Sequence, residues 1–167
     1  MQVVPNFIED KSVQEDIKSY LLYNSFGKNL EPFPYFYSDI SHDGSNFMFF
    51  HILFLGEKDN NFLSPQFVRV LSPILGRLKF NYLMRAKVNL YTKSSEFTET
   101  PMHTDSDIPH KVALYSVNSN NGYTLFEDGT KIESIENQMV IFDGSKKHCS
   151  VSQTDTNVRV NININFQ

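Results

Sequence analysis

The sequence predicts an α+β protein, mainly β, in which helices come first and short strands follow. Helix signals are confined to residues 1–80, whereas residues 83–166 carry short β segments separated by Gly, Asn, Asp and Ser turns. The length of 167 residues suits one domain with a core better than two. We therefore expect a single domain, 1–167, with a helical support region (1–80) and a β core (83–166).

Two helices are expected in the support region. Asp10 or Ser12 can cap a first helix that runs to about Tyr23. Gly27 and the Pro32/Pro34 pair then mark a loop. Ser64-Pro65 suits the start of a second helix, because Ser is a favoured cap and Pro fits the first turn; this helix is expected to run to about residue 78.

The strands are expected from apolar runs and from alternation. Residues 47–55 form a continuous apolar run of the length of a buried strand. In the later region the spacing of short strands is typical of a sandwich or barrel. The expected strands there are 83–91, 99–104, 111–117, 123–126, 131–135, 138–142, 147–152 and 158–166.

The first and last strands of the β core alternate apolar and polar residues cleanly. Successive side chains of a strand point to opposite faces, so each strand has one apolar face, which the N-terminal helices can cover. The other face carries Tyr91 with Asn89 on one strand, and Arg159 with Asn161 and Asn163 on the other. These polar faces could meet solvent, as in many antiparallel sheets, or could line a polar interior that holds a small anion.

Three residues form a candidate metal site. His103 and Asp105 are two positions apart at an expected strand end, so both side chains share a face, and His148 lies in a later strand. Two histidines and one carboxylate on one face of Fe(II) leave other positions open. Arg159 follows on the final strand, where a buried guanidinium needs an anionic partner such as a dicarboxylate.

This order of residues resembles the 2-oxoglutarate/Fe(II) dioxygenases of the double-stranded β-helix (jelly-roll) fold, most of all the prolyl 4-hydroxylase-like branch with its compact phage-encoded members. The resemblance covers about Arg85 to the C-terminus. It is carried by Asn89-Leu90-Tyr91, His103-Thr104-Asp105, 121–126 (Asn-Gly-Tyr-Thr-Leu-Phe), 141–144 (Ile-Phe-Asp-Gly) followed by His148, and Arg159.

The resemblance implies specific roles for these residues. His103, Asp105 and His148 would be the iron ligands and the catalytic centre. Arg159 would bind the C5 carboxylate of 2-oxoglutarate, with the Tyr91 hydroxyl beside it, and we expect Asn89 and Asn161 to line the same cosubstrate site. Fe(II), 2-oxoglutarate and O2 would be required, with ascorbate as a further candidate.

The sequence departs from the family pattern at three places. Asn121 replaces the first Gly of the usual Gly-Gly-x-Thr turn, Asn157-Val158 stand where a Gly often precedes the Arg, and the final strand ends at Phe166 rather than a Trp. None of these changes removes a ligand. They weaken the assignment to a particular subfamily, and therefore to a particular substrate.

The expected activity is hydroxylation of an unactivated C–H bond. The branch favours a peptidyl substrate, proline first, with a free amino acid or another small molecule as the alternative. Substrate would enter near loops 92–101 and 104–110, which could act as a lid. A non-catalytic jelly-roll binding module stays open, whereas a cupin-type enzyme would need a His-x-His pair that the chain lacks.

Charge and composition limit the classes of binding partner and indicate the cellular compartment. A net charge of −4 without a Lys/Arg cluster argues against nucleic acid, and no apolar run approaches the roughly 20 residues of a membrane helix. The single Cys149 fits a reducing compartment. We expect a cytoplasmic protein, in the host cytoplasm if it is phage-encoded; the sequence does not predict an oligomeric state.

The remaining candidate residues have simpler interpretations. Asp107 could replace Asp105 as a ligand but fits a turn better. His110 could line the pocket, but it is expected rather at the surface or behind the ligands, and His42 and His51 are expected to be structural. Cys149 follows His148 on its strand and should face away from the metal, in the core.

Overall fold

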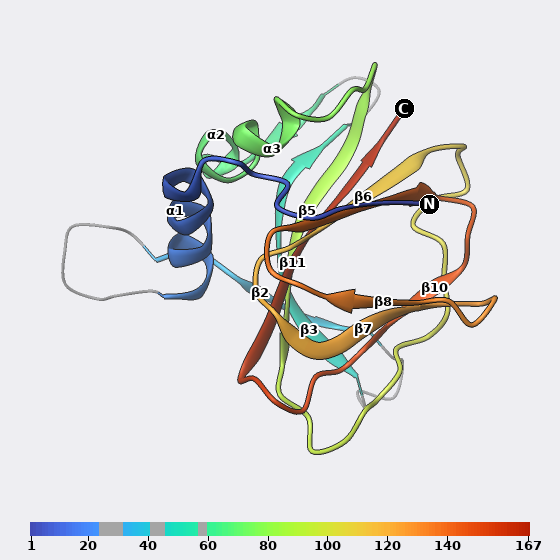
Figure 1. The fold of residues 1–167 in the computed structure, drawn as a ribbon. Coiled ribbons are helices and arrows are strands. Elements are labelled where there is room, and N and C mark those ends of the chain that lie inside the picture. The colour runs from blue at the N-terminus through green and yellow to red at the C-terminus, as the bar shows by residue number, and fades with distance from the viewer. Residues whose placement is uncertain (24–31, 41–45, 57–59) are drawn as a thin grey trace.

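A computed structural model describes residues 1–23, 32–40, 46–56 and 60–167. Gly27 and His42, for which the sequence predicts a loop and a structural role, lie outside these ranges. Two β-sheets face each other, and the helices lie on the far side of the larger sheet (Figure 1).

The elements follow the predicted order, with helices early and strands late. They are β1 (Gln2–Val4), α1 (Lys11–Leu22), β2 (Phe36–Asp39), β3 (Phe47–Leu55), β4 (Phe62–Leu63), α2 (Phe67–Val70), α3 (Ser72–Leu75), β5 (Leu83–Thr92), β6 (Lys111–Ser116), β7 (Asn120–Phe126), β8 (Lys131–Ser134), β9 (Gln138–Asp143), β10 (His148–Val151) and β11 (Val158–Phe166).

The two sheets form a double-stranded β-helix. The larger sheet has the order β1-β9-β6-β11-β5-β3-β2, with β4 paired to β3, and the smaller sheet has the order β10-β7-β8. From β5 onward the chain winds between them: β6, β9 and β11 join the larger sheet, whereas β7, β8 and β10 join the smaller one. The predicted mainly β, jelly-roll class is confirmed, and so are the strands predicted at 47–55, at 83–91 and between 111 and 166.

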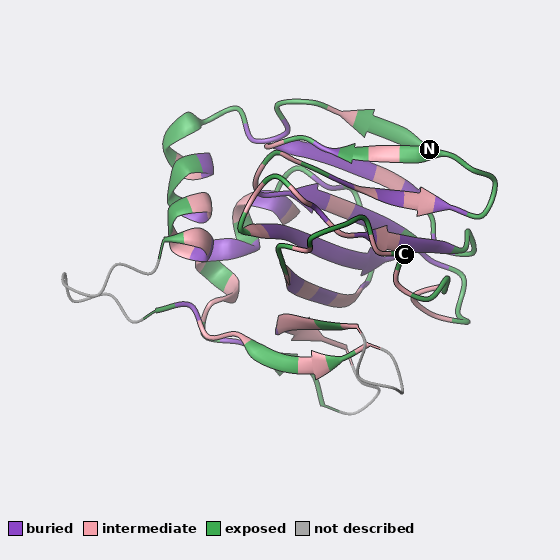
Figure 2. Cartoon of the chain, turned by 90° about the horizontal axis from the view of Figure 1, so that it is seen from below, coloured by how far each residue is buried: buried purple, intermediate pink, exposed green. Residues whose placement is uncertain are grey.

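Alternation along β5 and β11 decides what lies on each side of the larger sheet. The two strands pair antiparallel, with Arg159 opposite Tyr91 and Ile162 opposite Val88. The apolar set, which includes Val88 and Ile162, is fully buried in one cluster with Ile17 of α1 and Ile74 of α3. The helices therefore cover this outer face, as predicted (Figure 2).

The first helix forms where the sequence places it. Asp10 is the N-cap, and its carboxylate accepts hydrogen bonds from the amides of Ser12 and Val13. This contact satisfies amides that have no partner within the helix. Ile17 and Leu21 form the buried face.

The predicted second helix is wrong in its extent. Two short helices, α2 and α3, replace the single helix expected from Ser64 to about residue 78. Pro73 accounts for the break, because a proline inside a helix has no amide to donate and its ring clashes with the preceding turn. The apolar residues still reach the core, since Val70, Leu71 and Ile74 are fully buried.

The strand predicted at 99–104 is also wrong. This segment runs beside β10 but makes only two isolated bridges, Glu99 with Val151 and His103 with His148. Pro101 lies between the bridges and has no amide to donate to a ladder. Thr100 also breaks the regular pattern, because its side-chain oxygen accepts the Ser150 amide at 3.0 Å.

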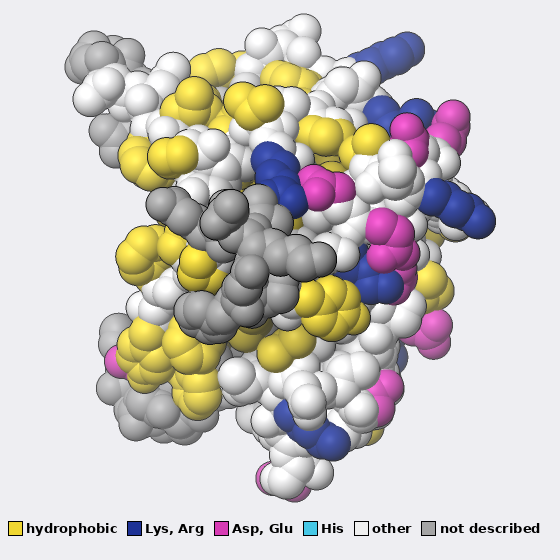
Figure 3. All heavy atoms as spheres, turned by 90° about the vertical axis from the view of Figure 1, so that its left-hand side faces the viewer, with side chains coloured by type: hydrophobic (Ala, Val, Ile, Leu, Met, Phe, Trp, Pro, Cys, Tyr) yellow, Lys and Arg dark blue, Asp and Glu magenta, His cyan; other side chains and the backbone are white. Residues whose placement is uncertain are grey.

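The face that carries α1 mixes charged side chains of both signs with separate hydrophobic groups (Figure 3). Ion pairs tie the helix to its surroundings, with Arg69 on Asp16 at 2.6 Å and Lys18 on Glu136 at 2.9 Å. In the parts of the chain described above, no helix has the length and apolar character needed to cross a membrane.

Candidate metal and cosubstrate site

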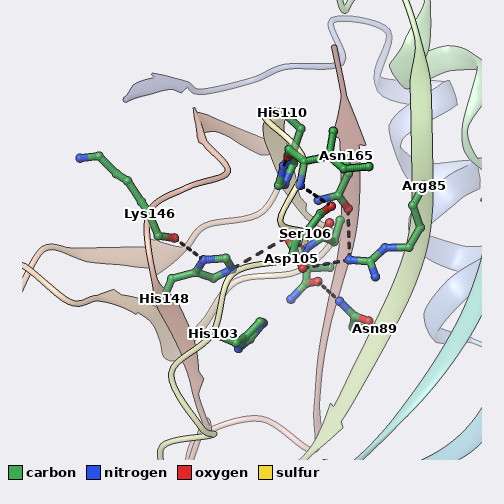
Figure 4. A network of polar contacts seen from close by, with 12 residues as sticks. Arg85, Asn89, His103, Asp105, Ser106, His110, Lys146, His148 and Asn165 are labelled. Carbon is green, nitrogen blue, oxygen red and sulfur yellow. Dashed lines mark hydrogen bonds and ion pairs between the residues drawn. The ribbon is translucent and has the colours of Figure 1, made fainter.

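His103, Asp105 and His148 converge between the two sheets. One potential ligand atom from each of the three residues lies within 4.8 Å of the others. The Nε2 atom of His148 is 4.0 Å from Oδ2 of Asp105, and the two imidazole rings have centroids 5.0 Å apart (Figure 4). Two imidazoles and one carboxylate at this spacing form a donor set that suits a divalent transition metal.

The two histidines are joined directly through their backbones. The amide of His103 donates to the carbonyl of His148 at 3.0 Å, and the amide of His148 donates back to the carbonyl of His103 at 2.9 Å. This reciprocal pair lies at the start of β10 and replaces the strand end that the sequence predicts for His103. A single bridge is therefore sufficient to set the distance between the two side chains.

The imidazoles are oriented for metal binding. Nδ1 of His103 lies 3.0 Å from the carbonyl of Pro101, and Nδ1 of His148 lies 3.0 Å from the carbonyl of Lys146. A carbonyl only accepts hydrogen bonds, so Nδ1 must carry the proton and Nε2 keeps its lone pair. Burial lowers the pKa of His148, which favours the neutral form that binds a metal.

Asp105 is held by two donors on the larger sheet. Arg85 of β5 donates to Oδ1 at 2.9 Å (Figure 4). Asn163 of β11 donates to Oδ2 at 3.1 Å. Burial alone would raise the pKa of Asp105, but the Asn163 hydrogen bond and the Arg85 charge outweigh burial and hold that pKa below its usual value. Arg85 occupies Oδ1, and this leaves Oδ2 on the side of His148.

Arg159 faces the interior from the final strand and is only 3% exposed. Its guanidinium donates to the hydroxyl of Ser150 at 2.8 Å and to the carbonyl of Val151 at 2.9 Å, and it lies 5.6 Å from the ring centre of Tyr91. Nε has no hydrogen-bond partner among the described residues. None of these partners is a carboxylate, so the guanidinium can still bind an anion.

Tyr91, Asn89 and Asn161 line the same cavity as Arg159. Burial raises the pKa of Tyr91, so its hydroxyl stays protonated and can donate a hydrogen bond. Asn89 donates to Asn161 at 3.0 Å, while the buried Oδ1 of Asn89 has no partner within the described ranges. These polar atoms have the chemistry of a small-anion site rather than of a sealed core.

A cavity of about 250 Å³ joins the triad to Arg159. Polar residues of the larger sheet form one wall, and residues of the smaller sheet and of the segment before His103 form another. The lining residues are Ile40, Met48, Lys87, Asn89, Tyr91, Thr100, Pro101, His103, Asp105, Leu114, Thr124, His148, Cys149, Ser150, Arg159, Asn161 and Asn163. The sequence left open whether the polar faces meet solvent or an interior; they line an interior.

Of the residues that hold Asp105 and Arg159, only Asn163 was singled out from the sequence, as part of the polar face and not as a partner of Asp105. Arg85 and Asn163 hold Asp105, while Ser150 and Thr124 contact Arg159. The alternation that identified Asn89 and Tyr91 places Arg85 on the same face of β5, four residues before Asn89 and six before Tyr91. Ser150 and Thr124 come from β10 and β7, and only the pairing of the two sheets brings them close.

The other histidines and Asp107 lie outside the triad. His51 is buried between the carbonyl of Pro34 and the hydroxyl of Ser64, which fits the structural role expected for it. His110 is buried, with Nδ1 2.7 Å from the carbonyl of Ile108, so the surface placement considered for it is wrong. Asp107 is exposed, and Cys149 is buried as expected.

No protein-family model matches the chain, and no curated protein matches its sequence. Solved structures do match. A prolyl hydroxylase from Trichoplax adhaerens, in complex with a hypoxia inducible factor peptide fragment, aligns over 99% of this chain and 82% of its own, with a TM-score of 0.61 and 14% identity. A 2OG-Fe(II) oxygenase family oxidoreductase from Burkholderia pseudomallei aligns over 80% and 73%, with a TM-score of 0.57 and 11% identity.

A third match is the viral collagen prolyl hydroxylase of Paramecium bursaria Chlorella virus-1, solved with 2OG. It aligns over 98% of this chain and 93% of its own, with a TM-score of 0.54 and 12% identity. The chain has the fold of these oxygenases. At such low identities the likeness shows the fold alone, and the chemistry depends on the residues of the site.

Proposed function

We propose that this protein is an Fe(II)- and 2-oxoglutarate-dependent dioxygenase that hydroxylates an unactivated C–H bond. In this reaction one oxygen atom of O2 enters the substrate as a hydroxyl group and the other enters 2-oxoglutarate, which leaves as succinate and CO2. We also propose that residues 1–167 act as one catalytic domain. The bound iron would supply the activation of O2, and the protein supplies binding, orientation and electrostatics.

One observation carries the proposal: three potential metal ligands share a cavity with a buried guanidinium that has no carboxylate partner among the described residues. His103, Asp105 and His148 would hold the iron. Arg159 would bind the C5 carboxylate of 2-oxoglutarate, with Tyr91 donating to the same end. A buried, unpaired guanidinium is costly in a purely structural module, so its presence favours a catalytic or ligand-binding role.

The substrate proposed first is a peptidyl residue such as proline. The support is the shared fold with two structures described as prolyl hydroxylases, one of them solved with a peptide fragment. A free amino acid or another small molecule is the second candidate, since the cavity is small and lined by several polar side chains. Ascorbate is proposed as an auxiliary reductant of the iron.

The test is the visible metal-to-ligand charge-transfer band that forms when 2-oxoglutarate chelates Fe(II). Fe(II) and 2-oxoglutarate are added anaerobically to the wild-type protein, and the band should develop with one equivalent of each. Asp105→Ala should abolish it, because the metal loses its only carboxylate ligand. Asp107→Ala is the matched control, since that exposed carboxylate lies two positions away and should leave the band intact.

The two variants also separate the alternatives. A band that survives in Asp105→Ala and disappears in Asp107→Ala would identify Asp107, and not Asp105, as the carboxylate ligand. A folded wild-type protein that binds neither Fe(II) nor 2-oxoglutarate would identify a non-catalytic jelly-roll module and overturn the proposal.

A further inference from the structure

Lys87 lies on the inner face of β5, between Arg85 and Asn89. It lines the cavity that contains the proposed iron ligands. Its Cα pairs with that of Asn163 on β11, and the Asn163 side chain in turn donates to Asp105. The ammonium group of Lys87 is thus close to the metal-binding carboxylate but is not part of the contacts that hold it.

Like Arg159, this ammonium group has no anionic partner among the described residues of the cavity, but it also lacks hydrogen-bond partners there. Arg85 forms an ion pair with Asp105, and Arg159 donates to hydroxyl and carbonyl groups of the smaller sheet. Among the described residues Lys87 has no hydrogen-bond or ion-pair partner, and its Nζ only approaches the ring of Phe50, at 5.8 Å. A half-buried lysine in this condition should gain from an anionic ligand.

The electrostatics agree with an uncompensated charge. Burial is the main cause that lowers the pKa of Lys87 to about 8, and the neighbouring Arg85 lowers it further. Asp105 acts in the opposite direction, but its effect on the pKa of Lys87 is smaller than that of burial or of Arg85. An anion placed beside Lys87 would remove this penalty.

The strand register separates Lys87 from the proposed cosubstrate anchor. Arg159 pairs with Tyr91, four residues along β5 from Lys87. At roughly 3.3 Å per residue the two positions are about 13 Å apart along the strand. The cavity lining therefore contains two separate cations: Lys87, at the level of the Asn163 that contacts Asp105, and Arg159, further along the paired strands.

We propose that Lys87 is a substrate-binding residue that recognises a carboxylate of the molecule to be hydroxylated. This inference rests on the proposed function, because it assigns Arg159 to 2-oxoglutarate and leaves Lys87 for the second organic ligand. It narrows the substrate to a carboxylate-bearing molecule. The carboxylate belongs either to a small free acid or to an acidic side chain of a peptide.

The dimensions of the cavity favour a carboxylate over a larger anion. Its volume of about 250 Å³ lies below the roughly 300–1,000 Å³ typical of ligand pockets, and the cosubstrate takes part of it. A phosphate group would also require several donors, whereas Arg85 is engaged by Asp105. The cavity lining also includes the apolar side chains of Met48 and Ile40.

The experiment uses pairs of probes that differ only by a carboxylate and an amide. L-aspartate with L-asparagine, and L-proline with L-prolinamide, test the free-acid source. A blocked peptide with a central Asp, and the same peptide with Asn, test the side-chain source. Each probe is titrated into the protein loaded with Fe(II) and 2-oxoglutarate, anaerobically for shifts of the charge-transfer band and aerobically for added succinate release.

In the wild-type protein at least one carboxylate probe should bind about tenfold or more tightly than its amide partner. Lys87→Met, which keeps the stem and removes the charge, should abolish this preference, and Lys87→Arg should retain part of it. Lys79→Met is the matched control, because Lys79 is exposed and lies away from the cavity. The pair that responds identifies the source of the carboxylate.

Three results would overturn the inference. Equal responses to every carboxylate and amide, including no response to either, would remove the carboxylate requirement. A preference that persists in Lys87→Met would assign it to another residue. A large rise in the dissociation constant of 2-oxoglutarate in Lys87→Met would make Lys87 part of the cosubstrate site. Throughout, an intact charge-transfer band in wild type without probe shows that the proposed function itself has not failed.

Discussion

The two faces of strands β5 and β11 are built from alternating residues of the same strands, and both are buried, yet they differ in polarity. The outer face carries Ala86, Val88 and Ile162, fully buried beneath the helices. The inner face carries Arg159 and Asn161, which are equally inaccessible but polar. Burial of the outer set stabilises the fold, whereas burial of the inner set costs desolvation.

The difference separates residues that fold the protein from residues that serve its ligands. Several inner-face atoms, including Oδ1 of Asn89 and Oδ1 of Asn163, have no partner in the described part of the chain. A face selected for stability alone would not keep such atoms. Substitutions on the inner face should therefore alter ligand binding, and substitutions on the outer face should alter stability.

The largest expected effect is at Arg159. Arg159→Leu should raise the dissociation constant of 2-oxoglutarate at least about 100-fold, because two or more charge-assisted hydrogen bonds to the C5 carboxylate are lost. Isothermal titration calorimetry under anaerobic conditions measures it. The dissociation constant of Arg159→Lys should lie between those of the wild-type protein and Arg159→Leu, since lysine keeps the charge but lacks the planar guanidinium.

Arg77→Leu is the control for this prediction. Arg77 pairs with Glu9 on the surface and is remote from the cavity, so its loss should leave the 2-oxoglutarate affinity within about twofold. A folded Arg159→Leu protein with wild-type affinity would show that the inner face does not hold the cosubstrate.

The second prediction concerns the outer face. Ile162→Ala should lower the free energy of unfolding by about 2–5 kcal/mol, because it leaves a cavity in the core beneath the helices. Urea denaturation followed by circular dichroism measures the change. At low temperature, where the variant is folded, the affinity for 2-oxoglutarate should match that of wild type. A strong loss of affinity would mean that the two faces are not independent.

The smallest expected effect is at Asn163 of the inner face. Asn163→Leu should weaken metal binding about tenfold, because Asp105 loses the amide that orients Oδ2. The free energy of unfolding should change by no more than about 1 kcal/mol, since an apolar group of similar size replaces an amide whose oxygen is unpaired. Asn157→Leu, at an exposed position, is the control. Unchanged metal affinity in Asn163→Leu would show that Asn163 does not contribute to metal binding through Asp105.

Much of this contrast could be predicted from the sequence. Alternation in 83–91 and 158–166 is local, and the period of a strand translates it directly into two faces. The convergence of His103, Asp105 and His148 could be proposed only from the order of motifs, because the distance between them depends on sheet pairing. The helical cap at Asp10 was predictable because it involves neighbouring amides.

Other features depended on contacts that no local pattern encodes. The segment 99–104 has the composition of a strand, but Pro101 and the Thr100 side chain interrupt its pairing with β10. The short strands β1, β2 and β4 have too few residues to show a period. Lys87 was visible as a polar residue of an alternating strand, but the pairing of Arg85 with Asp105, which leaves Lys87 without a partner among the described residues, depends on the folded structure.

The reciprocal backbone bridge between His103 and His148 separates the geometry of the site from the length of the chain between the two residues. Insertions or deletions in the turns that join β6 to β9 would leave the spacing of the two imidazoles unaltered, provided that the bridge forms. The sequences of these turns can therefore vary without changing the metal site. A library that randomises the Asp128-Gly129 turn should yield variants that keep wild-type iron affinity.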